Sequence, residues 1–476
     1  EMSASLVGSE MCIRDREKRT SGKTKKVDVM SYIKVVGRPI SRTLVHSFAG
    51  GVNTRNDESV LPISTAKNCY NFKFESGTLT SGKGFLSAGL SAECVWQFCL
   101  RVAAQNKVIT MYYLAGKVYY IEDGEGKELQ GVTLTSPPQA VNYTLYGKDV
   151  VLICSPTDNM VVWDGENDAY FVENSPKITS MTMHYERLFA TTSTDKYTLY
   201  FSDDLDPTNW NENITEGGFI QMLDERGELL KVISFLGYVY VFREHGISRV
   251  TAYADQTQFA VTHLFTASGK IFADTVALCG DKVMFACEDG IYVFDGLSAR
   301  KVLSNLDGFI KSDSHSTAIF YEGKYYLSLR VDYDGKVGCE NGEYINNVVL
   351  IYGDGYEIVR GYDIRKFCAG DELYAISGTS VLKIGTNGLQ KCWESPVVDL
   401  GSSKRKRVLW LYLDTCCDVT VTFIGDGIQK SVTVSGSATA QRVRVDMTCR
   451  KFGLRIVSID DAPKVSRPQI YYRYTE

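Results

Sequence analysis

The sequence predicts an all-β protein: a β-propeller of about seven blades, or six, followed by a C-terminal β-sandwich. Three observations lead to this prediction. A pair of hairpins recurs roughly every 40 to 50 residues through the middle of the chain, the length of a propeller blade. Strands that alternate apolar and polar residues follow it. The 476 residues include 29 Tyr, 21 Phe and 41 Gly, and aromatic residues with glycine-rich turns favour β-structure.

Residues 1–29 are expected to form a disordered leader. Residues 3–16 have no amphipathic period, and a basic run follows at 18–26. The 3–16 stretch also resembles a translated adaptor sequence, so that Met30 is the expected native start. The alternative is a basic arm that binds nucleic acid. The leader lacks the apolar core of a signal peptide, and secretion by the usual route is therefore not expected.

Residues 30–95 are expected to form an N-terminal segment that closes the ring of blades. A hairpin pattern lies at residues 71–85, and one of its strands is predicted to join the last blade. Closure of this kind removes the exposed edge strands that an open array would leave.

Residues 96–394 are expected to form the propeller. Each unit begins with a strand, a tight polar turn and a more apolar strand, as in 143–153 and 232–242. A second hairpin follows, often turning at Asp-Gly, as in 161–172 and 291–302. Two hairpins make a four-stranded antiparallel sheet, and neighbouring sheets must stack because one sheet alone cannot bury both faces. Two stacked sandwiches are the alternative arrangement.

Residues 395–476 are expected to form the sandwich, of the jelly-roll or immunoglobulin kind. Apolar and polar residues alternate in six segments with turns between them, which indicates strands with one buried and one exposed face. The segments are 408–414, 419–426, 430–436, 442–448, 452–460 and 469–475.

Composition limits the classes of partner. The formal net charge of -5 and a pI near 5.8 give no general attraction to nucleic acid or to anionic membranes. No apolar stretch is long enough for a membrane span. The 13 cysteines show no C-x-x-C spacing, so we expect reduced, mostly buried side chains rather than a disulfide framework or a zinc site. If the adjacent Cys416 and Cys417 lie in a strand, they should face opposite sides and not pair with each other.

No catalytic, cofactor-binding or metal-binding residue is predicted, and the protein is not expected to be an enzyme. The five histidines are spread along the chain, without the spacing of a helical metal motif. Residues 202–210, SDDLDPTNW, resemble the Asp box of sialidases, although Asp206 stands where that box has glycine. We expect a loop capped by its own Asp and Asn side chains, with Trp210 packed beneath.

A basic run precedes the first strand of the expected sandwich: Lys404, Arg405, Lys406 and Arg407. A solvated linker is the simpler interpretation of such a run. The functional hypothesis is contact with DNA or with an acidic neighbouring protein.

Two segments carry a resemblance to a family. Residues 48–62, FAGGVNTRNDESVLP, and residues 186–212, ERLFATTSTDKYTLYFSDDLDPTNWNE, resemble the entry segment and a characteristic blade of bacteriophage propeller proteins. These are tail nozzle, tail hub and packaged-DNA stabilisation proteins. The resemblance implies a virion structural protein that is assembled in the host cytoplasm, forms part of the tail conduit and helps to retain or pass DNA. The implied partners are other tail or portal proteins, packaged DNA and further copies in a homo-oligomeric ring.

Two other functions stay open. A glycan-binding or host-recognition propeller would expose aromatic side chains on one loop face, with Trp163 and Trp210 as candidates. A sialidase-like glycoside hydrolase would need an arginine triad and a tyrosine nucleophile, which the sequence does not identify.

Overall fold

The described part of the chain is built from strands. The computed structural model describes residues 41–45, 47–91, 94–102, 107–210, 217–253, 256–310, 312–333, 336–337, 344–369, 372–378 and 380–475, and the predicted leader lies outside these ranges. These residues contain no α-helix, so none has the length and apolarity to cross a membrane. The all-β prediction is confirmed. The described 3-10 turns are η1 (Glu58–Val60), η3 (Gln256–Gln258), η4 (Ala273–Thr275) and η5 (Ser304–Leu306).

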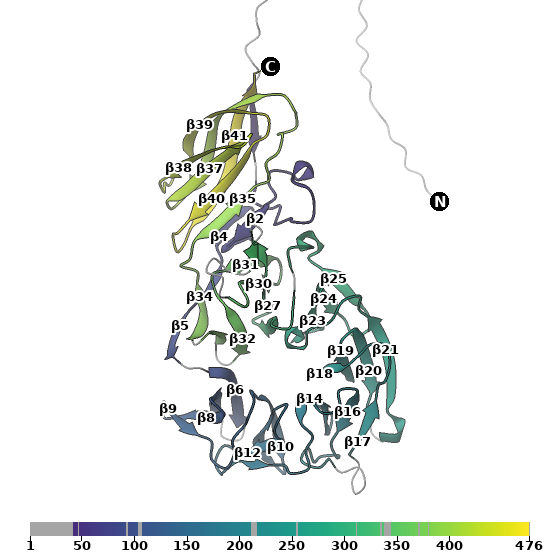
Figure 1. Cartoon of the computed structure of the whole chain (residues 1–476). Helices are drawn as coiled ribbons and strands as arrows, with labels where there is room; N and C mark the ends of the chain where they lie inside the picture. Colours follow the sequence, from purple (N-terminus) through teal and green to yellow (C-terminus); the bar gives the residue numbers. More distant parts are fainter. Residues whose placement is uncertain are drawn as a thin grey trace, which may run out of the picture. The chain divides into compact units, whose positions relative to one another are not determined.

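Seven four-stranded antiparallel sheets follow one another along the chain (Figure 1). The first is β6 (Cys94–Val102), β7 (Lys107–Leu114), β8 (Lys117–Glu122) and β9 (Glu125–Glu128). The second is β10 (Gln139–Leu145), β11 (Lys148–Cys154), β12 (Val161–Trp163) and β13 (Tyr170–Phe171). The third is β14 (Ile178–His184), β15 (Arg187–Thr192), β16 (Thr198–Phe201) and β17 (Gly218–Gln221).

The next three sheets repeat this order. The fourth is β18 (Leu229–Phe235), β19 (Tyr238–Arg243), β20 (Gly246–Thr251) and β21 (Ala260–Thr266). The fifth is β22 (Ala277–Cys279), β23 (Lys282–Cys287), β24 (Gly290–Phe294) and β25 (Ala299–Val302). The sixth is β26 (Thr317–Tyr321), β27 (Lys324–Leu329), β30 (Val348–Tyr352) and β31 (Tyr356–Arg360). A small hairpin, β28 (Asp332–Tyr333) and β29 (Lys336–Val337), interrupts the sixth.

The seventh sheet draws strands from both ends of the chain. β32 (Ile364–Ala369), β33 (Leu373–Ser377) and β34 (Ser380–Thr386) are joined by β5 (Lys83–Ser91), which pairs antiparallel with β34. The N-terminal segment therefore supplies the fourth strand. The predicted closing strand does come from this segment, but the hairpin itself lies elsewhere: β3 (Phe72–Glu75) pairs with β4 (Thr78–Ser81), and β4 pairs with the C-terminal strand β41. Leu79 is fully buried there.

The Asp-Gly hairpins have longer connections than the sequence predicts. β12 and β13 are separated by residues 164–169, and β24 and β25 by 295–298. The carboxylate of Asp295 accepts the backbone N–H groups of Leu297 (2.9 Å) and Ser298 (2.8 Å). The aspartate thus caps the loop with its side chain, and only the glycine adopts positive φ.

Neighbouring sheets bury apolar side chains between them, and in strands such as β23 every residue after Lys282 is buried. Such strands read as apolar runs because both faces are covered. Pairs of residues from consecutive sheets that share one buried cluster are Met111 and Trp163, Leu152 and Leu188, Phe189 and Val241, Phe242 and Phe285, Met284 and Leu327, and Tyr326 and Phe367.

Two larger sheets, which we call the C-terminal pair, share one buried cluster. The six-stranded sheet contains β3, β4, β41 (Lys464–Tyr474), β36 (Lys406–Thr415) and β39 (Gln441–Cys449), with β1 (Ser41–Val45) on β41. The five-stranded sheet contains β2 (Asn68–Tyr70), β35 (Lys391–Glu394), β40 (Gly453–Ser458), β37 (Val419–Gly425) and β38 (Ile428–Val434). The predicted 395–476 unit therefore also takes strands from residues 41–81 and 391–394.

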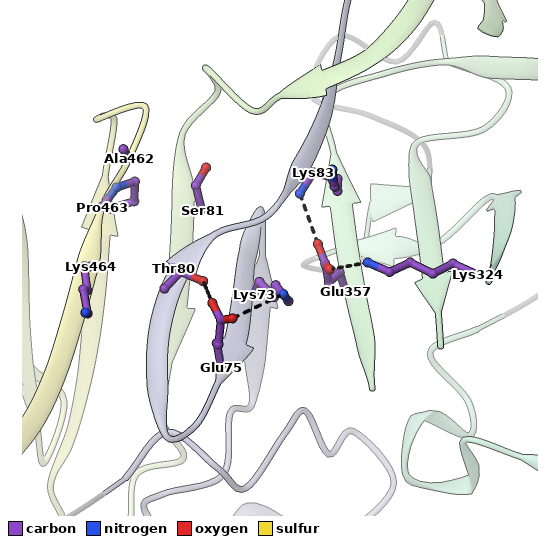
Figure 2. Close-up of a pocket in the computed structure, with 10 residues that line it drawn as sticks. All are labelled: Lys73, Glu75, Thr80, Ser81, Lys83, Lys324, Glu357, Ala462, Pro463 and Lys464. Carbon is purple, nitrogen blue, oxygen red and sulfur yellow. Dashed lines mark hydrogen bonds and ion pairs between the residues drawn. The ribbon is translucent and has the colours of Figure 1, made fainter. Parts of the chain in front are cut away.

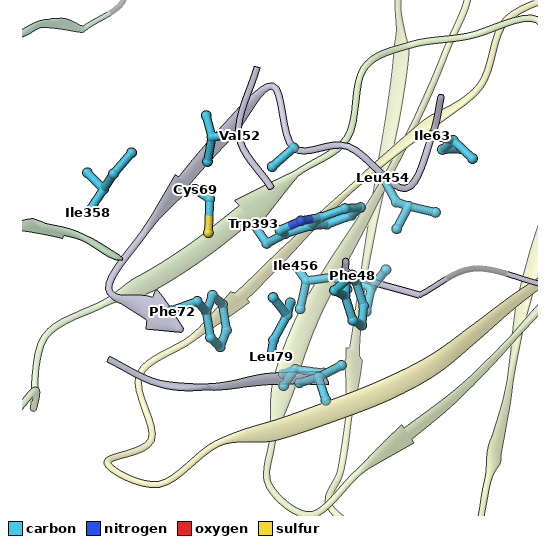
Figure 3. Close-up of a cluster of buried hydrophobic side chains, with 14 of the residues drawn as sticks. Phe48, Val52, Ile63, Cys69, Phe72, Leu79, Ile358, Trp393, Leu454 and Ile456 are labelled. Atoms are coloured by element: carbon cyan, nitrogen blue, oxygen red, sulfur yellow. The ribbon is translucent and has the colours of Figure 1, made fainter. Parts of the chain in front are cut away.

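Trp393 on β35 lies where the N-terminal segment enters this cluster (Figure 3). It is 2% exposed, and its ring meets Phe48 edge-on at a centroid distance of 4.9 Å. The same cluster continues through Ile358 of β31 to Leu327 and Leu350 of the sixth sheet. The C-terminal pair and the sixth sheet thus share one uninterrupted core.

The described cysteines are free and mostly buried, as expected. Burial raises the pKa of Cys154 and Cys392 to about 12 and that of Cys449 to about 11, so these thiols stay protonated at neutral pH. Cys416 is exposed, whereas the adjacent Cys417 is buried on the other side of the chain. We therefore expect iodoacetamide to label Cys416 first among the described cysteines, as read by peptide mass spectrometry.

Two controls make the labelling test specific. Cys416→Ser should remove the early label, and unfolding in urea should expose the remaining thiols. Labelling of Cys392 or Cys449 in the native protein at the rate of Cys416 would contradict the described packing.

Candidate functional site

The predicted basic run does not form one patch. Lys404 and Arg405 are exposed at the turn before β36. The next two residues belong to β36 and point to opposite sides. Arg407 faces outward and pairs with Asp446 at 2.7 Å, while Lys406 is fully buried.

The buried Lys406 has a structural role. Its ammonium donates to the carbonyl oxygens of Ser402 (2.5 Å), Lys404 (2.8 Å) and Arg450 (2.6 Å). Burial lowers the pKa of Lys406, and the three carbonyls provide the partners that a buried ammonium needs. Of the four predicted contact residues, only three are placed to meet a partner, and the inward side chain of Lys406 is not.

The side chains of the Asp-box-like loop form hydrogen bonds within the loop, as predicted. Asp206 accepts from the backbone N–H of Thr208 at 3.0 Å, and Asp203 accepts from that of Asp204 at 2.8 Å. Trp210 packs against the cluster between the second and third sheets. These contacts hold a turn in shape and bring no catalytic group to a cavity.

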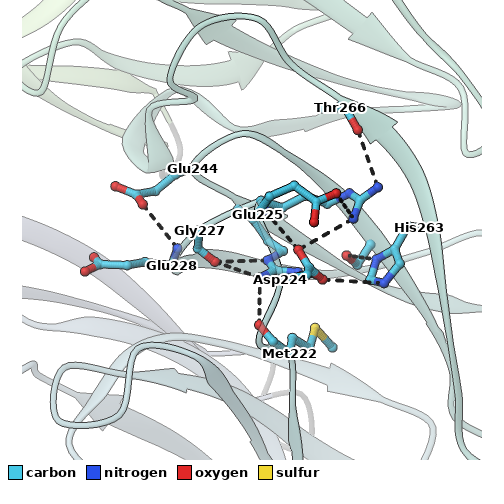
Figure 4. A network of polar contacts seen from close by, with 11 residues as sticks. Met222, Asp224, Glu225, Gly227, Glu228, Glu244, His263 and Thr266 are labelled. Atoms are coloured by element: carbon cyan, nitrogen blue, oxygen red, sulfur yellow. Dashed lines mark hydrogen bonds and ion pairs between the residues drawn. The ribbon is translucent and has the colours of Figure 1, made fainter.

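A serine and a histidine of the fourth sheet meet an aspartate of the loop before it, the arrangement most suggestive of catalysis in the described residues; Figure 4 shows His263 beside Asp224. Ser248 Oγ lies 3.0 Å from Nδ1 of His263, and His263 Nε2 lies 3.5 Å from Asp224 Oδ2. A nucleophilic serine must reach its substrate, but Ser248 is fully buried. The geometry fits a structural network.

The buried side chain of Arg243 lies at the centre of that network. It is 0% exposed, and its guanidinium donates to Asp224 Oδ2 (2.7 Å) and to the carbonyls of Met222 (2.7 Å) and Gly227 (2.8 Å). Burial alone would raise the pKa of Asp224, but the N–H of Arg226 and the guanidinium of Arg243 outweigh it and hold this pKa below its usual value. Asp224 is therefore the counter-ion of a buried cation.

A cavity of about 400 Å³ lies beside the hairpin β3–β4, the sixth sheet and residues 462–464 (Figure 2). Lys324 approaches the buried carboxylate of Glu357 at 3.6 Å, and the backbone N–H of Lys83 donates to the same carboxylate at 3.1 Å. Four lysines and two glutamates line the cavity: Lys73, Lys83, Lys324, Lys464, Glu75 and Glu357. The Glu357 carboxylate thus ties β5 to the sixth sheet and acts as the counter-ion of Lys324.

Two pairs of exposed tyrosines, Tyr146 with Tyr170 and Tyr185 with Tyr253, are a second candidate, and we call them together the tyrosine surface. Tyr146 is 81% exposed at φ 49° in the β10–β11 turn, a conformation that a bulky residue rarely adopts. It lines a cavity of about 440 Å³ with Tyr170 and donates to Asp206 at 3.1 Å. Tyr185 meets Tyr253 at a centroid distance of 5.6 Å.

The tryptophans proposed for glycan contact are not on this surface. Trp163 is buried and donates its Nε1–H to the carbonyl of Asn167, and Trp210 is partly buried. Sequence reasoning missed the tyrosines, although Tyr146 directly before Gly147 in a two-residue turn was a readable signal. In the described ranges, no three His, Cys, Asp or Glu residues are grouped to hold a metal ion.

Comparisons with known proteins identify no family. No family model and no curated protein matches the sequence. One similar solved structure is "BBS1N in complex with ARL6DN", at 9% identity and a TM-score of 0.42, covering 63% of this chain and 96% of that one. Another is the extracellular domain of the putative hybrid two-component system BT4673 from B. thetaiotaomicron, at 9% identity and a TM-score of 0.41. The match covers 77% of this chain and 48% of that one. Likeness of this size indicates no function.

Proposed function

We propose that the seven four-stranded sheets close into a seven-bladed β-propeller and that the C-terminal pair is a β-sandwich fused to it. Two observations support closure: β5 completes the seventh sheet from the other end of the chain, and β32 of that sheet contacts β6 of the first. A closed array leaves no long edge strand exposed.

We infer that this protein is a structural component of a bacteriophage tail, part of the conduit that retains or passes packaged DNA. The observation that carries this proposal is the interlock of the chain: its N-terminal strands complete the C-terminal pair, and β5 then completes the seventh sheet. A chain whose two ends are paired in the same sheets should resist forces applied by neighbouring tail proteins. The resemblance of residues 48–62 and 186–212 to phage propeller proteins supports the same assignment.

The expected setting follows from this function. The protein would be assembled in the host cytoplasm, would contact other tail or portal proteins and would repeat as a homo-oligomeric ring.

A glycan-binding or host-recognition propeller is the second candidate. The tyrosine surface favours it, because exposed aromatic rings beside carboxylates are suited to stack on sugars and to accept their hydroxyl hydrogen bonds.

Fractionation of particles separates the two candidates. A tail component should band with DNA-filled particles in a density gradient and be detected there by peptides from residues 41–475. Recovery only in the soluble fraction, together with retention on immobilised glycans, would favour the recognition function and contradict the tail assignment.

A further inference from the structure

The outer face of the six-stranded sheet carries an aromatic row. Residues of β36 alternate between buried and accessible, so one side packs on the shared cluster and the other faces solvent. Trp410 and Tyr412 of β36 and Tyr471 of β41 lie on the accessible side. Trp410 and Tyr471 are cross-strand partners.

Arginines surround this row, and we call them the arginine face: Arg407, Arg442, Arg444, Arg467 and Arg473. They come from three adjacent strands, which are about 4.8 Å apart in a sheet. Arg444 pairs in register with Trp410, and Arg407 with Arg473. The guanidinium of Arg442 lies 4.3 Å from the centre of the Trp410 ring, so this cation is held over an aromatic face.

Carboxylates balance the arginine face only in part. Asp446 contacts Arg407 at 2.7 Å and Arg444 at 3.1 Å, and Asp414 lies 3.8 Å from Arg467. The side chains of Arg444 and Arg467 are 70% and 77% exposed. Ion pairs at such exposure are weak, which leaves the guanidinium groups available to a stronger anion.

The charge of the chain is divided unevenly. Residues 395–476 contain thirteen Lys or Arg and eight Asp or Glu. Residues 94–386, the first six sheets and β32–β34, contain twenty-four Lys or Arg and thirty-nine Asp or Glu. The net charge of -5 conceals this division. A polyanion is therefore attracted to the C-terminal pair and repelled by the rest.

We propose that the arginine face binds the phosphate backbone of DNA without regard to base sequence, with Lys404 and Arg405 at its border. This inference rests on the proposed function, and it names the surface through which the protein meets packaged DNA. Guanidinium groups present paired donors that match phosphate oxygens, and an array of them over three strands suits a backbone of evenly repeated charge. An acidic protein segment is the competing partner.

Fluorescence anisotropy of a labelled duplex of about 30 base pairs tests the proposal between about 50 and 200 mM salt. The full chain should bind with a salt dependence of about −0.9 in log–log slope for each phosphate contacted. The triple variant Arg442→Gln, Arg444→Gln and Arg473→Gln should lose at least about tenfold in affinity and about 2 to 3 units of slope. These residues lie outside the buried cluster, so circular dichroism should stay unchanged.

A matched control removes three exposed cations from the acidic sheets: Lys148→Gln, Lys282→Gln and Arg300→Gln. It should bind DNA nearly as well as the parent chain and with the same salt slope. No binding by the parent, or equal losses in both triple variants, would overturn the proposal, as would binding of polyglutamate but not of DNA, which would assign the face to an acidic protein. The assay uses purified chain and DNA alone, so its failure is distinct from absence of the protein from particles.

Discussion

Replacing Arg243 with methionine should lower the free energy of unfolding by about 3 to 5 kcal/mol, the usual cost of removing one partner of a buried ion pair. The substitution leaves Asp224 without its guanidinium partner and the carbonyls of Met222 and Gly227 without their donors. Urea unfolding followed by fluorescence measures the loss. The network joins β19 of the fourth sheet to the loop between β17 and β18, so this region should open first.

Lys270→Met is the matched control. Lys270 pairs with Glu244 at the same distance, 2.7 Å, but its side chain is 44% exposed, and loss of such a pair costs at most about 1 kcal/mol. Equal destabilisation by both variants would contradict the buried role of Arg243.

The ion pair between Arg243 and Asp224 should also make the stability of the protein depend on pH. The folded pKa of Asp224 is lowered, so its contribution to stability is complete above the unfolded pKa and is lost as pH falls through the folded value. Stability of the parent chain should therefore decline below about pH 4 more steeply than that of Arg243→Met. Parallel pH profiles for the two proteins would contradict this linkage.

Trp393→Ala should cost about 3 to 5 kcal/mol, the range for removing a large aromatic side chain from a core. Trp393 contacts Phe48 in a cluster that continues into the sixth sheet, so the loss should destabilise the C-terminal pair and the sixth sheet together. Calorimetry should show a single transition moved to lower temperature. A separate early transition confined to residues of the C-terminal pair would contradict the shared core.

Trp393→Phe is the milder variant. It keeps a ring against Phe48, and it removes an indole N–H for which the described residues provide no acceptor. Its cost should be well below that of the alanine variant.

Local patterns were enough to predict the strands and their grouping into paired hairpins. Strand β37 alternates without a break, as expected for a sheet with one buried face, and residues 283–287 of β23 read as an apolar run because both faces are covered. The partner of the hairpin at 72–81 was not predictable from pattern, because alternation shows that a strand has a buried face but not which sheet covers it.

The candidate surfaces were predicted less well, for the same reason. The basic run was read as a linear patch, yet strand alternation sends Lys406 inward and Arg407 outward. The arginine face is assembled from three strands that are distant in sequence. Its one local signal is the alternation of Arg442, Arg444 and Asp446 along β39.

The decisive experiment for a role in the tail conduit is cryo-electron microscopy of gradient-purified, DNA-filled particles. Tail density should accommodate residues 41–475 in several copies related by rotation about the tail axis, with the arginine face toward the DNA. Complete tail density that no copy of this chain fits would contradict this role.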